Sequence, residues 1–412
     1  MIAWKSYKLS DVANLTTGFP FDGHKYAKDG VRVVRGDNVT IGSLRWDADK
    51  DKRWNEPFSR ACEYTLYDGD IVIGMDGSRV GKNRAQIYKS DLPLLLAQRV
   101  ACIRHNEKSY QEFLYYQIFS ERFVEYIKSV QTGTSIPHVS LKQIGDYPIQ
   151  LPPIEEQIRI AKILRSLDDK IALNNRINHN LEEQAQALYK SWFVDFEPFK
   201  DGKFIDSELG MIPDGWRIGT LSELGDIIAG GTPSKAKADY YTSSGIHWLT
   251  PKDLSNHCGK FTAKGETDIT PLGYKNSSAK LMPRGTVLFS SRAPIGYITI
   301  AKNDICTNQG FKSVVPTNAG TGYIYYWLKE HTSDIEAQAS GSTFKEASGA
   351  LMKSFSALIP PKEIIDSFEE KIRPLLGAQE KLEEEVEALS QARDLLLPSL
   401  MSGTLEINNL TC

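Results

Sequence analysis

The residues that could carry out catalytic chemistry are few, and their spacing is wrong for it. Gly81 and Lys82 resemble the end of a phosphate-binding loop, but Asn83 stands where such a loop needs Ser or Thr. Residues 369–371 (EEK) have the spacing of a nuclease acidic-x-Lys pair, but they fall in a heptad pattern that favours a solvated helix face. The seven histidines show no metal-ligand spacing. We therefore expect neither an active site nor a metal site in this chain.

Polar and basic residues are found instead in the loops of two similar blocks of the chain. Arg can contact guanine through two hydrogen bonds, Asn and Gln can read adenine, and Lys mainly contacts phosphate. We interpret these loop residues as candidate DNA-binding residues. In the first block they are Arg32, Arg35, Asn38, Ser78, Arg79, Lys82 and Arg84, and in the second block Thr232, Ser234, Lys235, Lys237, Ser291, Arg292, Asn308, Gln309 and Lys312.

The two blocks belong to an internal duplication. The tract at 132–153 (TGTSIPHVSLKQIGDYPIQLPP) aligns without a gap with the tract at 340–361 (SGSTFKEASGALMKSFSALIPP). Earlier in each block, Trp4 and Gly18 pair in the same order with Trp216 and Gly230. Repeats of one structural unit produce such ordered matches.

Each Pro-Pro pair is followed by a long predicted helix. Apolar residues recur there in alternating steps of four and three over about four heptads, which is typical of a coiled-coil seam. Asn174 and Asn178 replace two seam positions, and Asn178 should lie close to Gln379 in a polar layer that fixes the register. Pro374 predicts a kink or break near Arg373. The seam residues are Ile160, Leu164, Leu167, Ile171, Leu181 and Leu188 in the first helix, and Phe368, Ile372, Leu375, Leu382, Val386, Leu389 and Leu396 in the second.

The pattern predicts an α+β fold in which two similar mixed α/β domains are joined by two long antiparallel α-helices. These helices would form an intramolecular coiled coil, and the duplication would give a pseudo-two-fold axis. We expect strands near 31–34, 70–73, 246–249 and 286–289, and shorter helices at 110–128 and 321–338. The predicted boundaries are 1–152 (head 1), 153–196 (central helical spacer), 197–215 (linker), 216–360 (head 2), 361–403 (C-terminal helical spacer) and 404–412 (tail).

Composition sets limits on the class of protein. The 412 residues are 41% hydrophobic and 25% charged, as in ordinary globular proteins. No apolar run approaches the roughly 20 residues that cross a bilayer, and the first residues lack a signal core. Five scattered cysteines without a CxxC pair fit a reducing compartment, so we expect a cytoplasmic protein. The net charge of −3 hides mildly basic heads and acidic helices.

The sequence also contains four distinctive short motifs: residues 151–157 (LPPIEEQ), 191–196 (SWFVDF), 209–216 (LGMIPDGW) and 395–403 (LLLPSLMSG). With these motifs the chain resembles, over essentially its whole length, the DNA-specificity (S) subunits of type I restriction–modification systems. The second copy departs from the first after its Pro-Pro pair, where residues 362–365 (KEII) replace residues 154–157 (IEEQ). The resemblance implies that each head is a target recognition domain that reads one half of a bipartite DNA site. The helices would then set the length of the unread spacer.

The resemblance also implies partners. These are duplex DNA, two modification subunits that bind S-adenosylmethionine and methylate a flipped adenine, and restriction subunits that use ATP and magnesium. None of these cofactors is expected on this chain, which would be non-catalytic. Two alternatives stay open. One is a protein-binding coiled-coil scaffold without DNA contact, which salt-dependent DNA binding would exclude. The other is a free-standing methyltransferase or nuclease, which methyl transfer by the purified chain would support.

Overall fold

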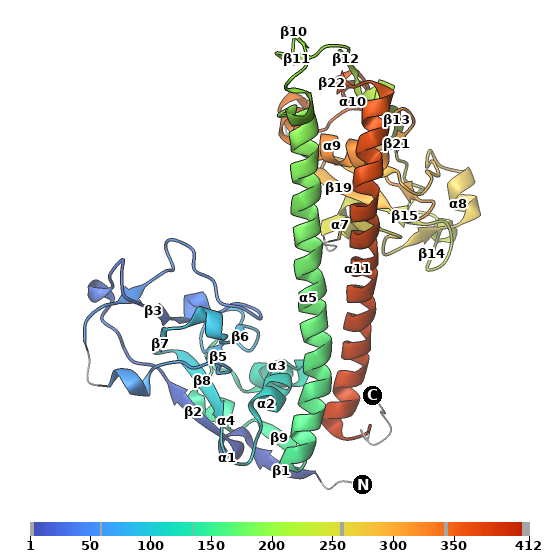
Figure 1. Cartoon of the computed structure of the whole chain (residues 1–412). Coiled ribbons are helices and arrows are strands. Elements are labelled where there is room, and N and C mark those ends of the chain that lie inside the picture. Colours follow the sequence, from blue (N-terminus) through green and yellow to red (C-terminus); the bar gives the residue numbers. More distant parts are fainter. Residues whose placement is uncertain (1–3, 58–59, 134, 256–258, 342–344, 406–412) are drawn as a thin grey trace. The chain divides into compact units, whose positions relative to one another are not determined.

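The computed structural model describes residues 4–57, 60–133, 135–255, 259–341 and 345–405. The chain forms two compact units, of which the first contains residues 1–170 and 389–412 and the second contains residues 171–388. Two long helices, α5 (Ile154–Phe193) and α11 (Lys362–Ser402), each contribute to both units. Figure 1 shows the elements of each unit.

The main sheet of the first unit is antiparallel and has the order β2-β8-β5-β6. The central strand β5 is buried along its whole length. Its side chains alternate between two cores, since Ile71 and Ile73 pack on one side and Val72 on the other. A strand covered on both faces reads as a continuous apolar run, which explains its sequence. The strands are β2 (Ala13–Thr17), β5 (Ile71–Gly74), β6 (Arg84–Gln86) and β8 (Val100–His105).

Smaller elements complete the first unit. A three-stranded sheet has the order β4-β3-β7, with β3 and β7 parallel, and β1 pairs with β9. The helix predicted at 110–128 is two helices, because Ser120 interrupts it and its hydroxyl accepts a hydrogen bond from the Phe123 amide. The elements are β1 (Lys5–Lys8), β3 (Val31–Val34), β4 (Arg53–Trp54), β7 (Leu94–Leu96), β9 (Pro148–Leu151), α1 (Leu9–Val12), α2 (Gln111–Ile118), α3 (Glu121–Val130), α4 (Leu141–Gly145), and the 3₁₀ turns η1 (Gly23–Lys25), η2 (Gly36–Asn38), η3 (Ala61–Glu63) and η4 (Lys89–Asp91).

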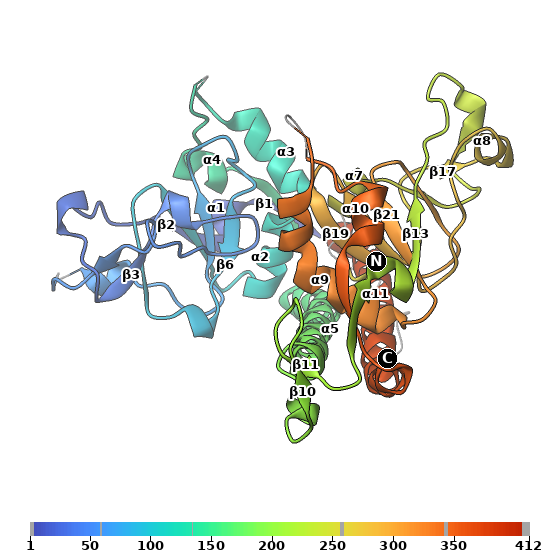
Figure 2. The same cartoon turned by 90° about the horizontal axis from the view of Figure 1, so that it is seen from above.

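The second unit has a five-stranded sheet in the order β13-β21-β18-β19-β16. Its pairs are antiparallel except β16 with β19. Helix α9 (Thr321–Gln338) packs on β19, as Figure 2 shows, and its bounds match the predicted helix. The strands are β13 (Gly225–Ala229), β16 (Phe261–Thr262), β18 (Val287–Ser291), β19 (Ile295–Ala301) and β21 (Lys312–Pro316).

Short strand pairs surround this second sheet. β15 runs parallel to β20, β14 pairs with β17, and β12 pairs with β22. The predicted linker contains a two-stranded antiparallel pair, β10 with β11. The elements are β10 (Phe204–Ile205), β11 (Ile212–Pro213), β12 (Arg217–Thr220), β14 (Tyr241–Thr242), β15 (Trp248–Leu249), β17 (Asp268–Ile269), β20 (Cys306–Thr307), β22 (Ser356–Ile359), α6 (Leu221–Leu224), α7 (Pro251–Ser255), α8 (Pro271–Lys275), α10 (Gly349–Ser354), η5 (Glu197–Phe199) and η6 (Ala238–Tyr240).

The two heads repeat one topology. The order β2-β8-β5-β6 in head 1 corresponds to β13-β21-β18-β19 in head 2, and the parallel pair β3 and β7 corresponds to β15 and β20. Gly18 and Gly230 also play the same role. A Cβ atom on Gly18 would lie 2.2 Å from the Leu96 carbonyl oxygen, and one on Gly230 would lie 1.9 Å from the Asn308 carbonyl oxygen. Only glycine permits so close an approach, so the predicted duplication is confirmed in the fold.

The helices α5 and α11 pack against each other and run antiparallel within each unit. Residues of increasing number in α5 contact residues of decreasing number in α11. Figure 1 shows both helices. The contacts are Asn174 Nδ2 to Glu385 Oε2 at 2.9 Å and Gln379 Nε2 to Glu182 Oε2 at 3.3 Å in the second unit, and Arg393 Nη1 to Asp168 Oδ1 at 2.9 Å in the first. This confirms the predicted fold class.

The predicted seam and its polar layer are present. Every predicted seam residue is buried or half-buried. Asn174 is fully buried, and its Oδ1 atom has no hydrogen-bond partner among the described residues. Gln379 donates from Nε2 to the backbone carbonyl of Asn178 at 3.4 Å, as the register predicted. The layer therefore leaves a buried polar atom unsatisfied, which lowers stability.

Of the kink or break predicted near Arg373, the break is wrong. Helix α11 continues through Pro374 without interruption from Lys362 to Ser402. Proline removes a helix hydrogen bond, but Phe368 and Ile372 before it and Leu376 after it are buried in the core of the second unit. This packing on both sides of the proline holds the helix together.

The described cysteines Cys62, Cys102 and Cys306 are free thiols. Burial raises the pKa of the Cys306 thiol to about 12, so this thiol stays protonated and unreactive at neutral pH. Within the described part of the chain, no helix combines the length and the apolar character needed to cross a membrane.

Candidate nucleic-acid interface

Head 1 contains a groove of about 640 Å³, lined by the loops that follow β2, β3, β5 and β7. Four arginines line it, Arg35, Arg45, Arg79 and Arg99, against two aspartates. Ser78 lies on the same rim. A concave surface with excess positive charge concentrates an anionic partner such as the DNA backbone.

The arginines of this groove differ in how firmly they are held. Arg35 donates from Nη2 to Asp37 Oδ2 at 3.0 Å and lies 5.8 Å from the centre of the Tyr26 ring. Arg45 donates from Nε to the Asp37 carbonyl at 2.9 Å. Arg79 is exposed, and its side chain has no hydrogen bond or ion pair within the described part of the chain. A long, unheld cation of this kind is suited to a phosphate contact.

Arg99 is held by a carboxylate from a neighbouring loop. Its Nη1 atom donates to Asp76 Oδ2 at 2.9 Å, and the other oxygen of Asp76 pairs with Nδ1 of His138. Burial alone would raise the pKa of Asp76, but the hydrogen bonds from Arg99 and His138 outweigh it and lower that pKa. The carboxylate therefore stays charged and keeps its hold on the guanidinium at neutral pH.

Head 2 contains a second groove, of about 680 Å³. Its cations Lys235, Lys252 and Arg292 face two carboxylates, and Trp248 contributes to the wall. The Thr232 hydroxyl donates to Oε1 of Gln309 across the groove. The predicted residues on this lining are Thr232, Lys235, Arg292, Asn308 and Gln309.

One carboxylate, Glu346, holds Arg292 of the second groove. Arg292 pairs with Glu346 at 3.4 Å, and Lys312, which is almost fully buried, pairs with the same carboxylate at 3.1 Å. Ala293 beside them has a φ of 54°. Arg99 in the first groove has a φ of 64°. Non-glycine residues rarely adopt this left-handed conformation, and it is concentrated at functional sites.

The two grooves occupy equivalent places in the repeat. The first lies beside the loops after β2, β5 and β7, and the second beside the loops after β13, β18 and β20. Since these strands correspond in the two heads, the duplication has produced two grooves of the same construction.

Four of the predicted DNA-binding residues are buried inside the heads and stabilise the fold: Asn38, Arg84, Ser291 and Lys312. Asn38 donates to two backbone carbonyls, and so does Arg84. The Ser291 hydroxyl donates to the Gly310 carbonyl at 3.1 Å. The identity of a polar residue in a loop does not show whether its side chain forms hydrogen bonds inside the protein. The sequence therefore could not distinguish these residues from exposed ones.

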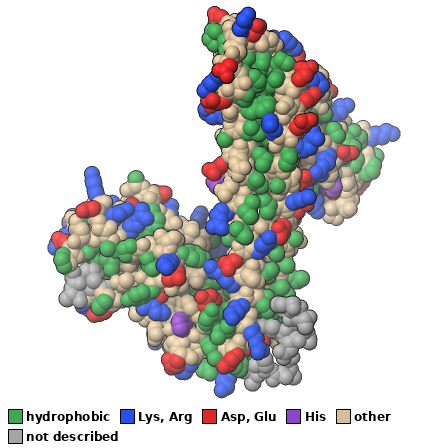
Figure 3. Space-filling view, viewed as in Figure 1, with side chains coloured by type: hydrophobic (Ala, Val, Ile, Leu, Met, Phe, Trp, Pro, Cys, Tyr) green, Lys and Arg blue, Asp and Glu red, His purple; other side chains and the backbone are tan. Residues whose placement is uncertain are grey.

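The remaining predicted residues lie on the heads but outside the two grooves. Arg32 is half-buried, pairs with Asp51 at 3.2 Å and covers the Trp46 ring at 4.9 Å. Lys82, Ser234 and Lys237 are exposed. On the face shown in Figure 3, Lys and Arg side chains are interspersed with Asp and Glu, so charge alone does not mark a single binding surface.

Sequence reasoning missed several groove residues, among them Arg45, Gln98, Arg99 and Lys252. Gln98 and Arg99 lie two and three residues after the end of β7, at the position that Gln309 and Gly310 occupy after β20. The recurring Gln at this point of the repeat was the one signal that could have indicated the loop.

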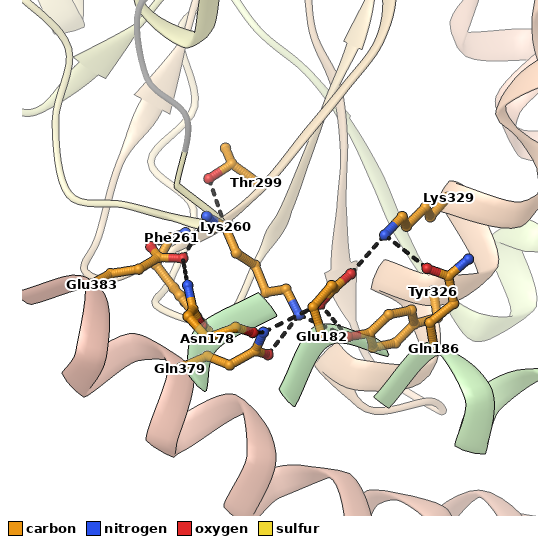
Figure 4. A network of polar contacts seen from close by, with 10 residues as sticks. All are labelled: Asn178, Glu182, Gln186, Lys260, Phe261, Thr299, Tyr326, Lys329, Gln379 and Glu383. Carbon is orange, nitrogen blue, oxygen red and sulfur yellow. Dashed lines mark hydrogen bonds and ion pairs between the residues drawn. The ribbon is translucent and has the colours of Figure 1, made fainter. Parts of the chain in front are cut away.

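Head 2 is joined to both long helices by a buried polar network, which Figure 4 shows from close by. Lys260 pairs with Glu182 of α5 and donates to the Tyr326 hydroxyl at 2.7 Å and to Gln379 Oε1 of α11 at 2.7 Å. Lys329 pairs with the same Glu182 at 2.6 Å. Burial alone would raise the pKa of Glu182, but the two ammonium groups outweigh it and lower that pKa to about 2.

Head 1 has a corresponding joint within the first unit. The Tyr116 hydroxyl donates to Asp168 Oδ2 of α5 at 2.7 Å, and Arg393 of α11 donates to the other oxygen at 2.9 Å. Tyr116 and Tyr326 occupy matching positions in α2 and α9. Each head is thus attached to the helices through a tyrosine and a carboxylate of α5.

The repeated heads match a known family. The model of the type I restriction modification DNA specificity domain matches residues 1–183 and again residues 213–388. The chain belongs to this family. Its two matched segments each contain one head and part of a long helix, so each groove lies in its own specificity domain.

Relatives of this specificity family match over nearly the full chain. The HindI specificity subunit of Haemophilus influenzae is 26% identical, over 98% of this chain and 100% of its own. The EcoBI specificity subunit of Escherichia coli is 24% identical, over 99% of this chain and 84% of its own. The crystal structure of a type I S subunit from M. genitalium has the same fold, with a TM-score of 0.66, 13% identity and coverage of 97% of this chain and 96% of that one.

Proposed function

We propose that this chain is the non-catalytic subunit that gives a type I restriction–modification complex its DNA sequence specificity. Each head reads one half of a bipartite duplex site through its groove, and the paired helices set the length of the unread spacer. The observation that carries this proposal is the pair of equivalent grooves, each with cationic and amide side chains at the same place in the repeat.

The chemistry of the grooves supports base reading as well as phosphate binding. Arg99 and Arg292 are held by carboxylates and present guanidinium groups suited to a guanine edge. Asn308 and Gln309 carry amides suited to adenine. Arg79 and Lys235, which are exposed, suit the phosphate backbone.

The long helices supply the surface for the partner subunits. Leu173 and Ile177 lie one turn apart on α5, and both are about 40% exposed. Apolar side chains exposed on one face of a long helix favour protein contact. The partners are two modification subunits, which supply S-adenosylmethionine and adenine methylation, and restriction subunits, which supply ATP- and magnesium-dependent cleavage. This chain itself binds none of these cofactors.

The proposal is tested by reconstituting the full chain with its modification subunits and sequencing the methylated DNA. We expect adenine methylation at one bipartite sequence with a fixed spacer. Binding should also weaken steeply with salt, because phosphate contacts release counterions. Methylation at a continuous sequence, or DNA binding by the complex that is insensitive to salt, would contradict it.

The alternative of a protein scaffold without DNA contact makes the opposite prediction. A scaffold would assemble the complex, but substitutions in the grooves would leave the DNA affinity of the complex unchanged. The double variant Arg79→Ala/Lys235→Ala, which changes one exposed cation in each head, measures this directly. The proposal predicts weaker DNA binding and intact assembly.

A further inference from the structure

Among the described residues of the first groove, Arg99 combines a strained backbone with a guanidinium that is held by a carboxylate of another loop. Its φ of 64° lies in the left-handed region, where a side chain is disfavoured. The neighbouring backbone fixes this conformation. The Gln98 amide donates to the Phe19 carbonyl at 2.9 Å, and the Arg99 carbonyl accepts from the Met75 amide at 3.0 Å.

The strained backbone presents the side chain to the groove. The Arg99 side chain is 70% exposed, yet its Nη1 atom is fixed on Asp76, which is only 25% exposed. Asp76 is itself held on its other side by His138. Among the described residues, the side-chain contacts of Arg99 use only Nη1, so the other N–H groups of the guanidinium stay available to a ligand in the groove.

The carboxylate beside Arg99 decides what the guanidinium can bind. A phosphate carries a full negative charge, which Asp76 repels at short range. A guanine edge presents two neutral acceptors, O6 and N7, that match two parallel N–H groups. An arginine held by a carboxylate is therefore better suited to a guanine than to the backbone.

The other arginines of the groove lack this arrangement. Arg35 and Arg45 are bound by residues of their own loop, around Asp37. Arg79 is unheld within the described part of the chain. Arg99 is joined instead to a loop 23 residues away, which fixes it relative to the main sheet.

From this geometry we infer that Arg99 reads a guanine in the half-site of head 1, and that Asp76 and His138 are positioning residues for its guanidinium. The inference rests on the proposed function, since it needs head 1 to bind DNA. The inference adds to that function the type of base that head 1 recognises and the residue that recognises it.

The test uses the full chain reconstituted with its modification subunits. Once methylation sequencing has given the half-sites, each guanine of both half-sites is replaced in turn by 7-deazaguanine, which lacks the N7 acceptor. The wild-type complex should methylate one such duplex on the order of 10-fold more slowly, because a two-bond guanine contact contributes a factor of this order or more. That guanine should lie in the half-site read by head 1.

Arg99→Gly is the informative variant. Glycine adopts a positive φ without strain, so the melting temperature should not fall. The variant should methylate the normal site about 10- to 100-fold more slowly, and it should no longer distinguish guanine from 7-deazaguanine at that one position. Its preference at the other half-site should stay as in the wild type.

Two further variants separate reading from folding and from phosphate binding. Asp76→Asn should keep the overall affinity but reduce discrimination at the same guanine, whereas a merely structural role would weaken all positions equally. Arg79→Ala is the matched control, and it should weaken binding to all sequences alike.

The outcomes distinguish the inference from the function on which it rests. If Arg99→Gly keeps the wild-type preference at every guanine, the inference is wrong although head 1 still binds DNA. If the wild-type complex shows no preference for any bipartite sequence, the proposed function fails as well.

Discussion

The hydroxyl of Tyr326 donates a hydrogen bond to Oε2 of Glu182 at 2.8 Å, although the two residues are 144 positions apart in the chain. Lys260 donates to the same hydroxyl oxygen at 2.7 Å and forms an ion pair with the same carboxylate. Because Tyr326 belongs to head 2 and Glu182 to α5, this contact fixes the head to the helix. Among the described residues, Glu182 is the one carboxylate that forms an ion pair with the Lys260 ammonium, so removing its charge has a large expected cost.

We predict that Glu182→Gln destabilises the second unit by about 3 kcal/mol, because two ammonium groups lose the charge that they share. The Lys260 side chain is only 6% exposed, so water cannot replace the lost partner. Urea unfolding followed by circular dichroism measures the change.

The matched control is Glu183→Gln on the exposed side of the same helix turn. Within the described part of the chain, the ion pair of Glu183 is with His179, at 3.4 Å, and both side chains are about two-thirds exposed. The expected change is below about 0.5 kcal/mol. Equal effects of the two substitutions would show that the buried network is not what stabilises this joint.

Acid should weaken the same joint. The pKa of Glu182 is about 2 in the folded chain against an ordinary value of 4.5. The unfolded chain therefore takes up this proton at higher pH than the folded chain does. The stabilisation is fully present above about pH 4.5 and is lost as the pH falls toward 2, to a total of about 3 kcal/mol. Accordingly, the difference in melting temperature between the wild type and Glu182→Gln should shrink below pH 4.5. A difference that stays constant down to pH 3 would contradict this assignment.

Arg292→Ala should change the sequence preference of head 2 alone. Arg292 lines the second groove and is held by Glu346, so its loss should cost about 1–3 kcal/mol at one base pair of one half-site. Methylation sequencing of the reconstituted complex measures the preference at each position. Lys235→Ala in the same groove is the control. Its exposed ammonium should act on phosphate, so binding should weaken on all sequences alike. The same uniform weakening with Arg292→Ala would make Arg292 a phosphate contact.

Deleting one heptad from both long helices should shorten the spacer. Removing residues 171–177 of α5 and 384–390 of α11 takes out about 10.5 Å of helix while keeping the seam in phase. At 3.4 Å per base pair, this corresponds to about three base pairs. Methylation sequencing should then show the same half-sites with a shorter spacer. An unchanged spacer with altered half-sites would contradict the role of the helices as a ruler.

The fold could be predicted from the sequence wherever a pattern extends over many residues. The heptad seams predicted α5 and α11, and the bounds of α9 were correct. Local signals were less reliable. Ser120 ended one helix in the middle of a predicted one, and Pro374 failed to end another because burial of its neighbours outweighed the missing hydrogen bond.

The candidate site could be predicted only in part, because residue type does not reveal exposure. Ser78, Arg79 and Arg292 were found from their loops, and they do line grooves. Asn38 and Lys312 are of equally suitable types but are buried in their heads. Arg99 was missed because its suitability for a base contact depends on a backbone angle and on a carboxylate 23 residues away. Neither feature leaves a local pattern in the sequence.

The paired strands at the base of each head have an evolutionary consequence. Lys5 of β1 lies opposite Leu151 of β9, and Arg217 of β12 lies opposite Ile359 of β22, so each head begins and ends at neighbouring points. A segment whose two ends lie side by side can be exchanged as a cassette without disturbing its surroundings. Under the proposed function, recombination at the two strand pairs would give the protein a new target sequence while α5 and α11 stay the same.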